Sequence, residues 1–135
     1  MRRALLLLAL LPGTAAAAPS VTGDWLVEDR NAVVTIAPCG PSICGRITRI
    51  LRREPGWNGT DVNNPDPKLR TRPVQGLAIL TGFKPDGGGI TGGRIYDPNS
   101  GRTYRSKVSL NADGSLKVSG CIAMFCRAQR WTRAR

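Results

Sequence analysis

The residues best suited to chemistry lie within one short stretch of the chain: Asp61, Asn64, Asp66, Arg70 and Arg72. Two guanidinium groups could bind a phosphate or a carboxylate through paired hydrogen bonds, with the carboxylates orienting them. This first hypothesis is an anion-binding site. The second is that the aspartates form ion pairs with the arginines and so hold the segment in place. The second is favoured, because the prolines of this segment also stiffen it.

A metal site and a catalytic site are weaker hypotheses. Asp61, Asn63 and Asp66 offer oxygen ligands, but the stretch lacks the glycine and the distant glutamate of an EF-hand. The chain has no histidine, which excludes Ser-His-Asp and Cys-His arrangements. Arginines lie near the carboxylates of the chain and lower the pKa of a neighbouring carboxyl group. These carboxylates are therefore poorly suited to act as general acids. We predict no metal, no cofactor and no catalytic residues, and a hydrolase using loop carboxylates is the least favoured function.

The formal net charge of +11 suits an acidic partner such as a phosphate, a lipid headgroup or an anionic polymer. The basic residues are scattered, however, and arginine outnumbers lysine 16 to 4, as in chains from GC-rich genomes. Composition is therefore the favoured source of the charge. With three Trp, two Tyr and two Phe, stacking side chains are scarce, which disfavours nucleic acid as a partner.

The N-terminal segment has the order of a secretory signal peptide. Two arginines precede an apolar run over residues 4–11, and small residues follow at 15–18. The run is too short to span a bilayer. We predict removal of residues 1–17, which leaves residues 18–135 as one exported domain, periplasmic or secreted, without a transmembrane segment.

Four cysteines form two pairs with the same spacing, Cys39 with Cys44 and Cys121 with Cys126. An even number in an exported chain indicates disulfides, and this spacing favours two local bridges. The other two pairings, and zinc held by four thiolates, are the alternatives.

The elements that must position these residues are short strands separated by turn signals. The alternation of apolar and polar residues predicts eight strands, at residues 23–28, 32–37, 45–51, 75–83, 90–96, 103–110, 115–122 and 126–133. Tight turns between them predict an all-β antiparallel meander closed into a small barrel, with a two-sheet sandwich as the alternative.

One connection is long, residues 52–73, and has no strand pattern. Long ordered loops often contain functional residues. Asp66 followed by Pro67 predicts a single helical turn through Arg70. Trp57 in the same loop is either a lid over the mouth of the barrel or, slightly favoured, a local hydrophobic anchor.

Several motifs resemble an exported bacterial protein family catalogued as domain of unknown function 2147. They are Asn-Pro-Asp-Pro-x-Leu-Arg-x-Arg-Pro at 64–73, Gly-Arg-Ile-Tyr-Asp-Pro at 93–98, Cys-Gly-Arg-Ile at 44–47 and Trp-Thr-Arg at 131–133. The resemblance spans about residues 23–133 and implies no activity.

A lipocalin-like barrel is the expected form of this fold. Gly23 and Trp25 match the Gly-x-Trp signature of lipocalins, in which an arginine covers the tryptophan ring. Barrel closure is accordingly expected from Gly23, Trp25, Trp131 and Arg133, with Arg127 as the alternative arginine.

These observations favour a non-enzymatic periplasmic barrel that binds a small or anionic ligand, with loop 52–73 at its mouth. The alternative is an interaction or structural protein of the cell envelope with a filled core. An apolar cavity inside the barrel would favour the first function if its volume were a few hundred Å³, which is on the order of the volumes of known ligand sites.

Overall fold

The computed structural model describes residues 9–13 and 20–135. The predicted signal peptide, residues 1–17, lies largely outside them and stays a prediction. Within the described part, no helix is long and apolar enough to cross a membrane.

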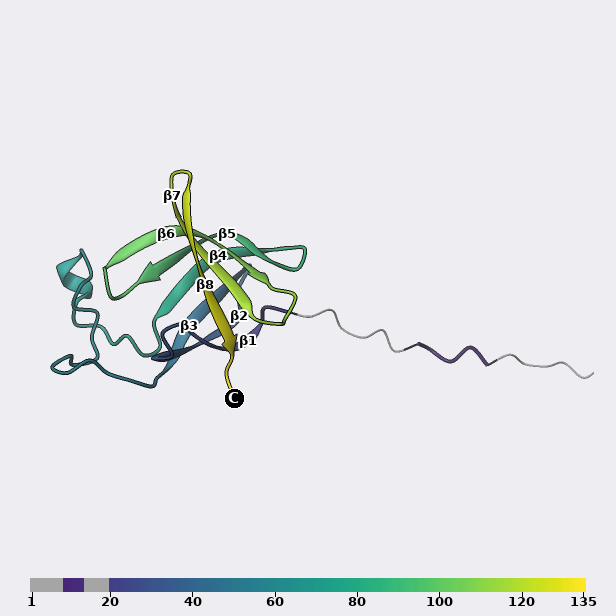
Figure 1. Cartoon of the computed structure of the whole chain (residues 1–135), viewed down its shortest axis with the longest axis horizontal. Helices are drawn as coiled ribbons and strands as arrows, with labels where there is room; N and C mark the ends of the chain where they lie inside the picture. Colours follow the sequence, from purple (N-terminus) through teal and green to yellow (C-terminus); the bar gives the residue numbers. More distant parts are fainter. Residues whose placement is uncertain (1–8, 14–19) are drawn as a thin grey trace, which may run out of the picture.

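Eight antiparallel strands form a closed barrel in chain order (Figure 1). Closure is made by β1 and β8, where Trp25 pairs with Arg133 and Leu26 with Thr132. This pairing confirms the predicted closed meander and excludes the sandwich. The strands are β1 (Gly23–Leu26), β2 (Ala32–Cys39), β3 (Ser42–Ile50), β4 (Ala78–Asp86), β5 (Gly89–Asp97), β6 (Arg102–Leu110), β7 (Leu116–Ile122) and β8 (Phe125–Arg133).

Strand boundaries depart from the sequence prediction at several ends: β1 ends at Leu26 rather than at residue 28, and β4 ends at Asp86 rather than at residue 83. Two further departures have a clear local cause. The ladder of β2 and β3 continues to the Cys39–Ser42 pair, because Gly40, with a φ of 62°, turns the chain within two residues. β4 starts at Ala78 rather than at residue 75, because the amide of Leu77 donates to the carbonyl of Val74 and closes a turn there.

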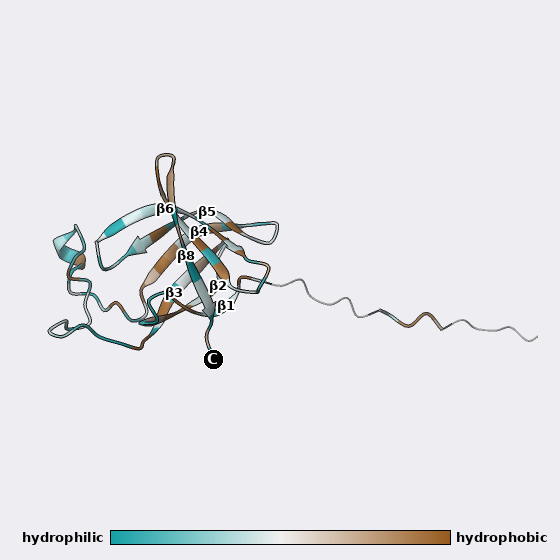
Figure 2. Cartoon of the chain, in the orientation of Figure 1, coloured by the Kyte–Doolittle hydropathy of each residue, from teal (hydrophilic) through white to brown (hydrophobic). Residues whose placement is uncertain are grey.

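The barrel interior is filled by large apolar side chains. Trp25, Phe83 and Trp131 are almost completely buried, together with branched residues from most strands. Two glycines make room for them: a Cβ on Gly93 would lie 2.3 Å from the Phe83 ring, and one on Gly45 would lie 2.7 Å from Leu80. Figure 2 shows the resulting mixture of hydrophobic and hydrophilic residues along the strands.

The Gly-x-Trp motif lies where the two ends of the barrel sequence meet. The guanidinium carbon of Arg133 lies 4.0 Å from the centroid of the Trp25 ring, a cation–π contact. Arg133 also donates to the carbonyls of Thr22 (2.8 Å) and Ser20 (2.6 Å). A Cβ on Gly23 would lie 2.6 Å from this guanidinium, so glycine is required for the arginine to reach the ring. Arg133, rather than Arg127, therefore covers Trp25.

The structure contains two disulfides, Cys39–Cys44 and Cys121–Cys126, which is the pairing that the spacing favours. Each lies beside the turn of a β-hairpin, the first between β2 and β3 and the second between β7 and β8. Because neighbouring strands run in opposite directions, the two hairpin turns lie at opposite ends of the barrel.

Candidate functional site

The long connection between β3 and β4 folds back on itself. Thr60 and Pro73 form an isolated antiparallel bridge, and the amide of Asp61 donates to the carbonyl of Arg72 at 3.0 Å. The predicted helical turn is present as the 3₁₀ helix η1 (Pro67–Leu69). The two limbs of the loop therefore place Asp61 opposite Arg72.

The loop docks on the turn between β5 and β6. The Asn63 side chain donates to the carbonyls of Pro98 (3.2 Å) and Asn99 (3.1 Å). Gly101 lies against the backbone of Asn63, where a Cβ would come within 1.9 Å of the Asn63 carbonyl oxygen. The loop is thus held by backbone contacts that other residues at position 101 would obstruct.

Asp61 is the centre of a buried polar network, with 1 % of its surface exposed. Its carboxylate accepts hydrogen bonds from the Tyr96 hydroxyl (2.6 Å), the Asn64 amide (2.9 Å) and Nε of Arg72 (2.9 Å). The Arg72 guanidinium also lies 5.7 Å from the centroid of the Tyr96 ring. Burial, and then the hydrogen bond to Asp61, raise the pKa of Tyr96 to about 12. A carboxylate with three donors is fully engaged within the protein.

The other predicted loop residues have separate partners. Asp66 accepts from the amide of Lys68 and caps η1, whereas Arg70 donates through Nε to the carbonyl of Asn64 at 2.8 Å. The hypothesis that both aspartates pair with the two arginines is therefore wrong for Asp66 and Arg70. Asp66 is engaged as a helix cap and Arg70 is drawn to a backbone carbonyl.

Trp57 lies at the base of the loop and packs against the core cluster. Its indole nitrogen donates to the carbonyl of Thr60 at 2.7 Å, and Arg53 lies 5.7 Å from its ring centroid. These contacts are those of the anchor hypothesis. Among the described residues, no group of three or more His, Cys, Asp or Glu side chains could hold a metal ion.

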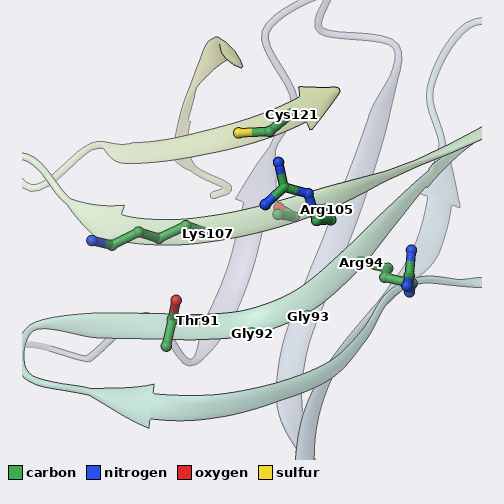
Figure 3. Close-up of a pocket in the computed structure, with 8 residues that line it drawn as sticks. Thr91, Gly92, Gly93, Arg94, Arg105, Lys107 and Cys121 are labelled. Carbon is green, nitrogen blue, oxygen red and sulfur yellow. The ribbon is translucent and has the colours of Figure 1, made fainter. Parts of the chain in front are cut away.

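A different group of basic residues lines a hollow of about 330 Å³, here called the β5–β6 groove (Figure 3). A bulge in β5 opens it: Ile90 pairs with Val108 and Gly93 with Ser106, so β5 has one more residue than β6 between these pairs. The lining residues are Thr91, Gly92, Gly93, Arg94, Arg105, Ser106, Lys107 and Cys121.

The groove is strongly cationic. Arg94 and Arg105 are directly opposite each other on neighbouring strands, and Lys107 lies two residues further along β6. All three side chains are exposed, and the groove lining contains no carboxylate. One guanidinium nitrogen of Arg105 donates to the carbonyl of Ala123. Like charges at directly opposite positions repel each other, so an anion between them would be stabilised.

A second hollow of about 390 Å³ is also basic. Arg30, Arg49, Arg133 and Arg135 contribute to its lining, and Arg133 is already engaged with Trp25. None of the residues lining either hollow belongs to the core cluster. Both hollows therefore lie outside the packed interior of the barrel.

Comparison with known proteins relates this barrel to a protein family and to a solved structure. Residues 23–133 match the family model described as "Uncharacterized protein conserved in bacteria (DUF2147)". The chain belongs to this family. No curated protein matches this DUF2147 chain.

A solved structure supports the lipocalin-like form of the DUF2147 barrel. It is protein HP1028 from Helicobacter pylori, described as belonging to the lipocalin family. The two structures share a TM-score of 0.74 and 20% sequence identity, over 87% of this chain and 85% of that chain. At this identity the likeness is one of fold.

Sequence patterns located part of the polar network in this DUF2147 chain, including its centre Asp61, and missed the partner Tyr96. Asp61, Asn64 and Arg72 lie together as one cluster, but Tyr96 joins them from β5. The groove arginines were missed as a site. Their signal was the alternation along β6, which puts Arg105 and Lys107 on the face opposite to the core residue Val108.

Proposed function

We propose that the mature chain is an exported, non-enzymatic lipocalin-like barrel that binds a small anionic ligand in the β5–β6 groove. The observation that supports this proposal most is the contrast in charge pairing. Arg94, Arg105 and Lys107 surround a hollow whose lining has no carboxylate, whereas Arg72 is paired with a buried aspartate.

The chemistry of the groove favours phosphate or carboxylate. Arg94 can offer a planar fork of N–H donors, Arg105 can offer the N–H groups that its hydrogen bond to Ala123 leaves free, and Lys107 adds a compact positive charge. The groove volume of about 330 Å³ is at the lower end of the range for small-molecule sites. A compact ligand with two or three negative charges therefore fits better than a long polymer.

In this proposal loop 52–73 is a scaffold rather than the ligand site. Asp61 already accepts three hydrogen bonds, and Arg72 and Arg70 donate through Nε to groups of the loop itself. An anion bound at the remaining nitrogens of Arg72 would lie beside the carboxylate of Asp61, which would repel it. The loop instead secures the β5–β6 turn, beyond the end of the strand that contains Arg94.

The test uses the disulfide-bonded mature chain, residues 18–135, with pyrophosphate and citrate as probes. Calorimetry and thermal shift should detect binding to the native chain. Replacing two groove cations, Arg94→Gln with Lys107→Gln, should weaken binding by about tenfold or more, because charge-assisted hydrogen bonds are lost.

The matched control removes the same charge elsewhere. Lys84 and Lys117 are exposed on β4 and β7 and line neither hollow. Lys84→Gln with Lys117→Gln should leave the affinity for pyrophosphate and citrate within about threefold of the native value. A change of that size is expected from the lower net charge alone, and it depends on salt screening. Equal weakening by both double variants would show that the anions respond to overall charge, and the groove proposal would be abandoned.

The filled core favours a second candidate function, an interaction protein of the cell envelope. Gly45 and Gly93 accommodate Leu80 and Phe83 so closely that these large side chains occupy the interior. Native mass spectrometry on protein purified from its own envelope separates the two functions. A small bound anion that is absent from the Arg94→Gln/Lys107→Gln chain supports the first, and a ligand-free chain bound to an envelope component supports the second.

A further inference from the structure

The turn between β7 and β8 exposes an unusual group of apolar side chains. Ile122 is 58 % exposed, Met124 91 % and Phe125 81 %, and these residues with Ala123 are here called the apolar tip. Figure 1 shows this hairpin projecting away from the barrel, and Figure 2 colours its end as hydrophobic. Single exposed apolar residues are common on proteins, but a contiguous group usually marks an interaction site.

The hairpin itself does not require these residues. Two-residue hairpin turns favour glycine, asparagine or aspartate, because at least one residue has a positive φ. Ala123 occupies that position with a φ of 51°, although glycine would adopt it with less strain. The disulfide-linked hairpin of β2 and β3 follows the usual preference, with Gly40 at its turn. Turn geometry therefore does not account for the apolar tip.

The base of the apolar tip is fixed by covalent and polar contacts. The Cys121–Cys126 disulfide brackets it, and Ile122 pairs with Phe125 across the last rung of the ladder. Arg105, from the neighbouring strand β6, donates to the carbonyl of Ala123. The tip is thus presented in an ordered form, which lowers the entropic cost of docking.

The surroundings of the apolar tip are positively charged. Arg105 lies at its base, and the exposed Arg127 follows the disulfide on β8. From Pro98 to the end of the chain the only acidic side chain is Asp113. That residue lies at the opposite end of β7, in the β6–β7 turn, and is paired with Arg130 at 2.7 Å.

We propose that the apolar tip docks the protein on an anionic lipid surface. Ile122, Met124 and Phe125 would enter the boundary between headgroups and acyl chains, and Arg105 and Arg127 would contact the headgroups. Apolar side chains beside arginines are the combination that binds such interfaces. This proposal shares Arg105 with the ligand proposed for the β5–β6 groove, but it rests on the exposed apolar side chains, which do not line that groove.

A second copy of the chain is a poorer occupant. Two copies would bring the same cationic surroundings together and repel each other. Three large side chains are also far fewer than the roughly 20–30 residues on each side of a stable protein interface. A lipid surface needs neither shape complementarity nor a wide contact.

The test measures co-sedimentation of the disulfide-bonded mature chain with vesicles of phosphatidylglycerol and phosphatidylcholine in equal parts. The native chain should bind these vesicles, bind pure phosphatidylcholine much less, and dissociate as salt is raised. Met124→Ser with Phe125→Ser should reduce vesicle binding by about tenfold or more, because the inserting side chains are lost. The control Val62→Ser, at another exposed apolar position, should bind like the native chain.

Two further measurements exclude misleading results. Phe125→Trp should show a blue shift of tryptophan emission with the mixed vesicles that the native chain, with its three tryptophans, does not show, and this difference reports insertion of the side chain at position 125. The melting temperature of Met124→Ser/Phe125→Ser should match that of the native chain, showing that the variant is folded whether or not the groove binds pyrophosphate. Unchanged vesicle binding by that variant would overturn the proposal. So would native self-association that the variant abolishes, because the occupant would then be a second copy.

Discussion

The long loop and the β5–β6 groove both contain arginines, yet the two groups of arginines have opposite electrostatic surroundings. In the loop, Arg72 donates to an aspartate with 1 % of its surface exposed. In the groove, Arg94 and Arg105 are opposite each other on the outer surface with no carboxylate in the lining. Arg72 is paired with a carboxylate of the protein, whereas Arg94 and Arg105 face each other and Arg105 donates only to a backbone carbonyl.

This difference shows why residue type alone does not identify a site. In the Asp61–Arg72 pair only the carboxylate is buried, and removing its partners would leave that buried charge uncompensated. Exposed like charges contribute little to stability or reduce it slightly. The two regions should therefore respond in opposite ways to substitution, one in stability and the other in binding.

The largest effect is expected at the centre of the loop network. Asp61→Asn should lower the free energy of unfolding by about 2–4 kcal/mol, because Tyr96 and Arg72 lose their shared acceptor charge. Chemical denaturation monitored by tryptophan fluorescence measures this change. Anion binding in the groove should be unchanged in the folded variant. A loss below about 0.5 kcal/mol would mean that the loop is not a scaffold.

A smaller effect is expected from Tyr96→Phe, about 1–2 kcal/mol at pH 8, through the lost hydrogen bond to the buried carboxylate. Its pH dependence is distinctive. The pKa of Tyr96 is raised to about 12 in the folded chain, whereas an unfolded tyrosine titrates near 10. The stability that Tyr96 provides is thus complete below pH 10 and is lost as the pH rises towards 12.

The stability difference between the native chain and Tyr96→Phe should therefore narrow between pH 10 and pH 12. Comparing the two chains isolates this residue, since they differ at no other position. Urea denaturation at each pH measures the difference. A difference that stays constant would contradict the assigned network.

The fold could be predicted from sequence because its signals are local. Alternation from Thr103 to Leu110 identifies β6 and its buried face, and turn residues mark most strand ends. Closure was predictable because the Gly23–Trp25 motif implies an arginine partner, and Arg133 fills that role. Strand ends beside the first disulfide were mispredicted, because a tight turn lets the ladder continue further than the alternation indicates.

The candidate sites depend on contacts that sequence spacing does not reveal. Tyr96 is 35 positions from Asp61 and meets it only because the loop docks on the β5–β6 turn. The groove exists because a bulge places Arg94 opposite Arg105. Phenylalanine is a residue type that is usually buried in a core, and Phe125 is exposed only because it lies in the projecting hairpin.

The smallest expected effect, and the sharpest contrast with Asp61, is that of Arg94→Gln on stability. Removing one of two opposed guanidinium groups relieves repulsion and breaks no ion pair, so the unfolding free energy should rise by about 0–0.5 kcal/mol. The gain should be larger at low salt, where screening is weakest. Denaturation at two salt concentrations, with Lys84→Gln as the control for net charge, measures it. A loss above about 1 kcal/mol would show that Arg94 supports the fold, and the two groups of arginines would then differ only in exposure. If Arg94→Gln raises the free energy of unfolding and lowers the affinity for pyrophosphate, the native arginine reduces stability but improves binding. This is the trade-off expected of a residue that binds a ligand.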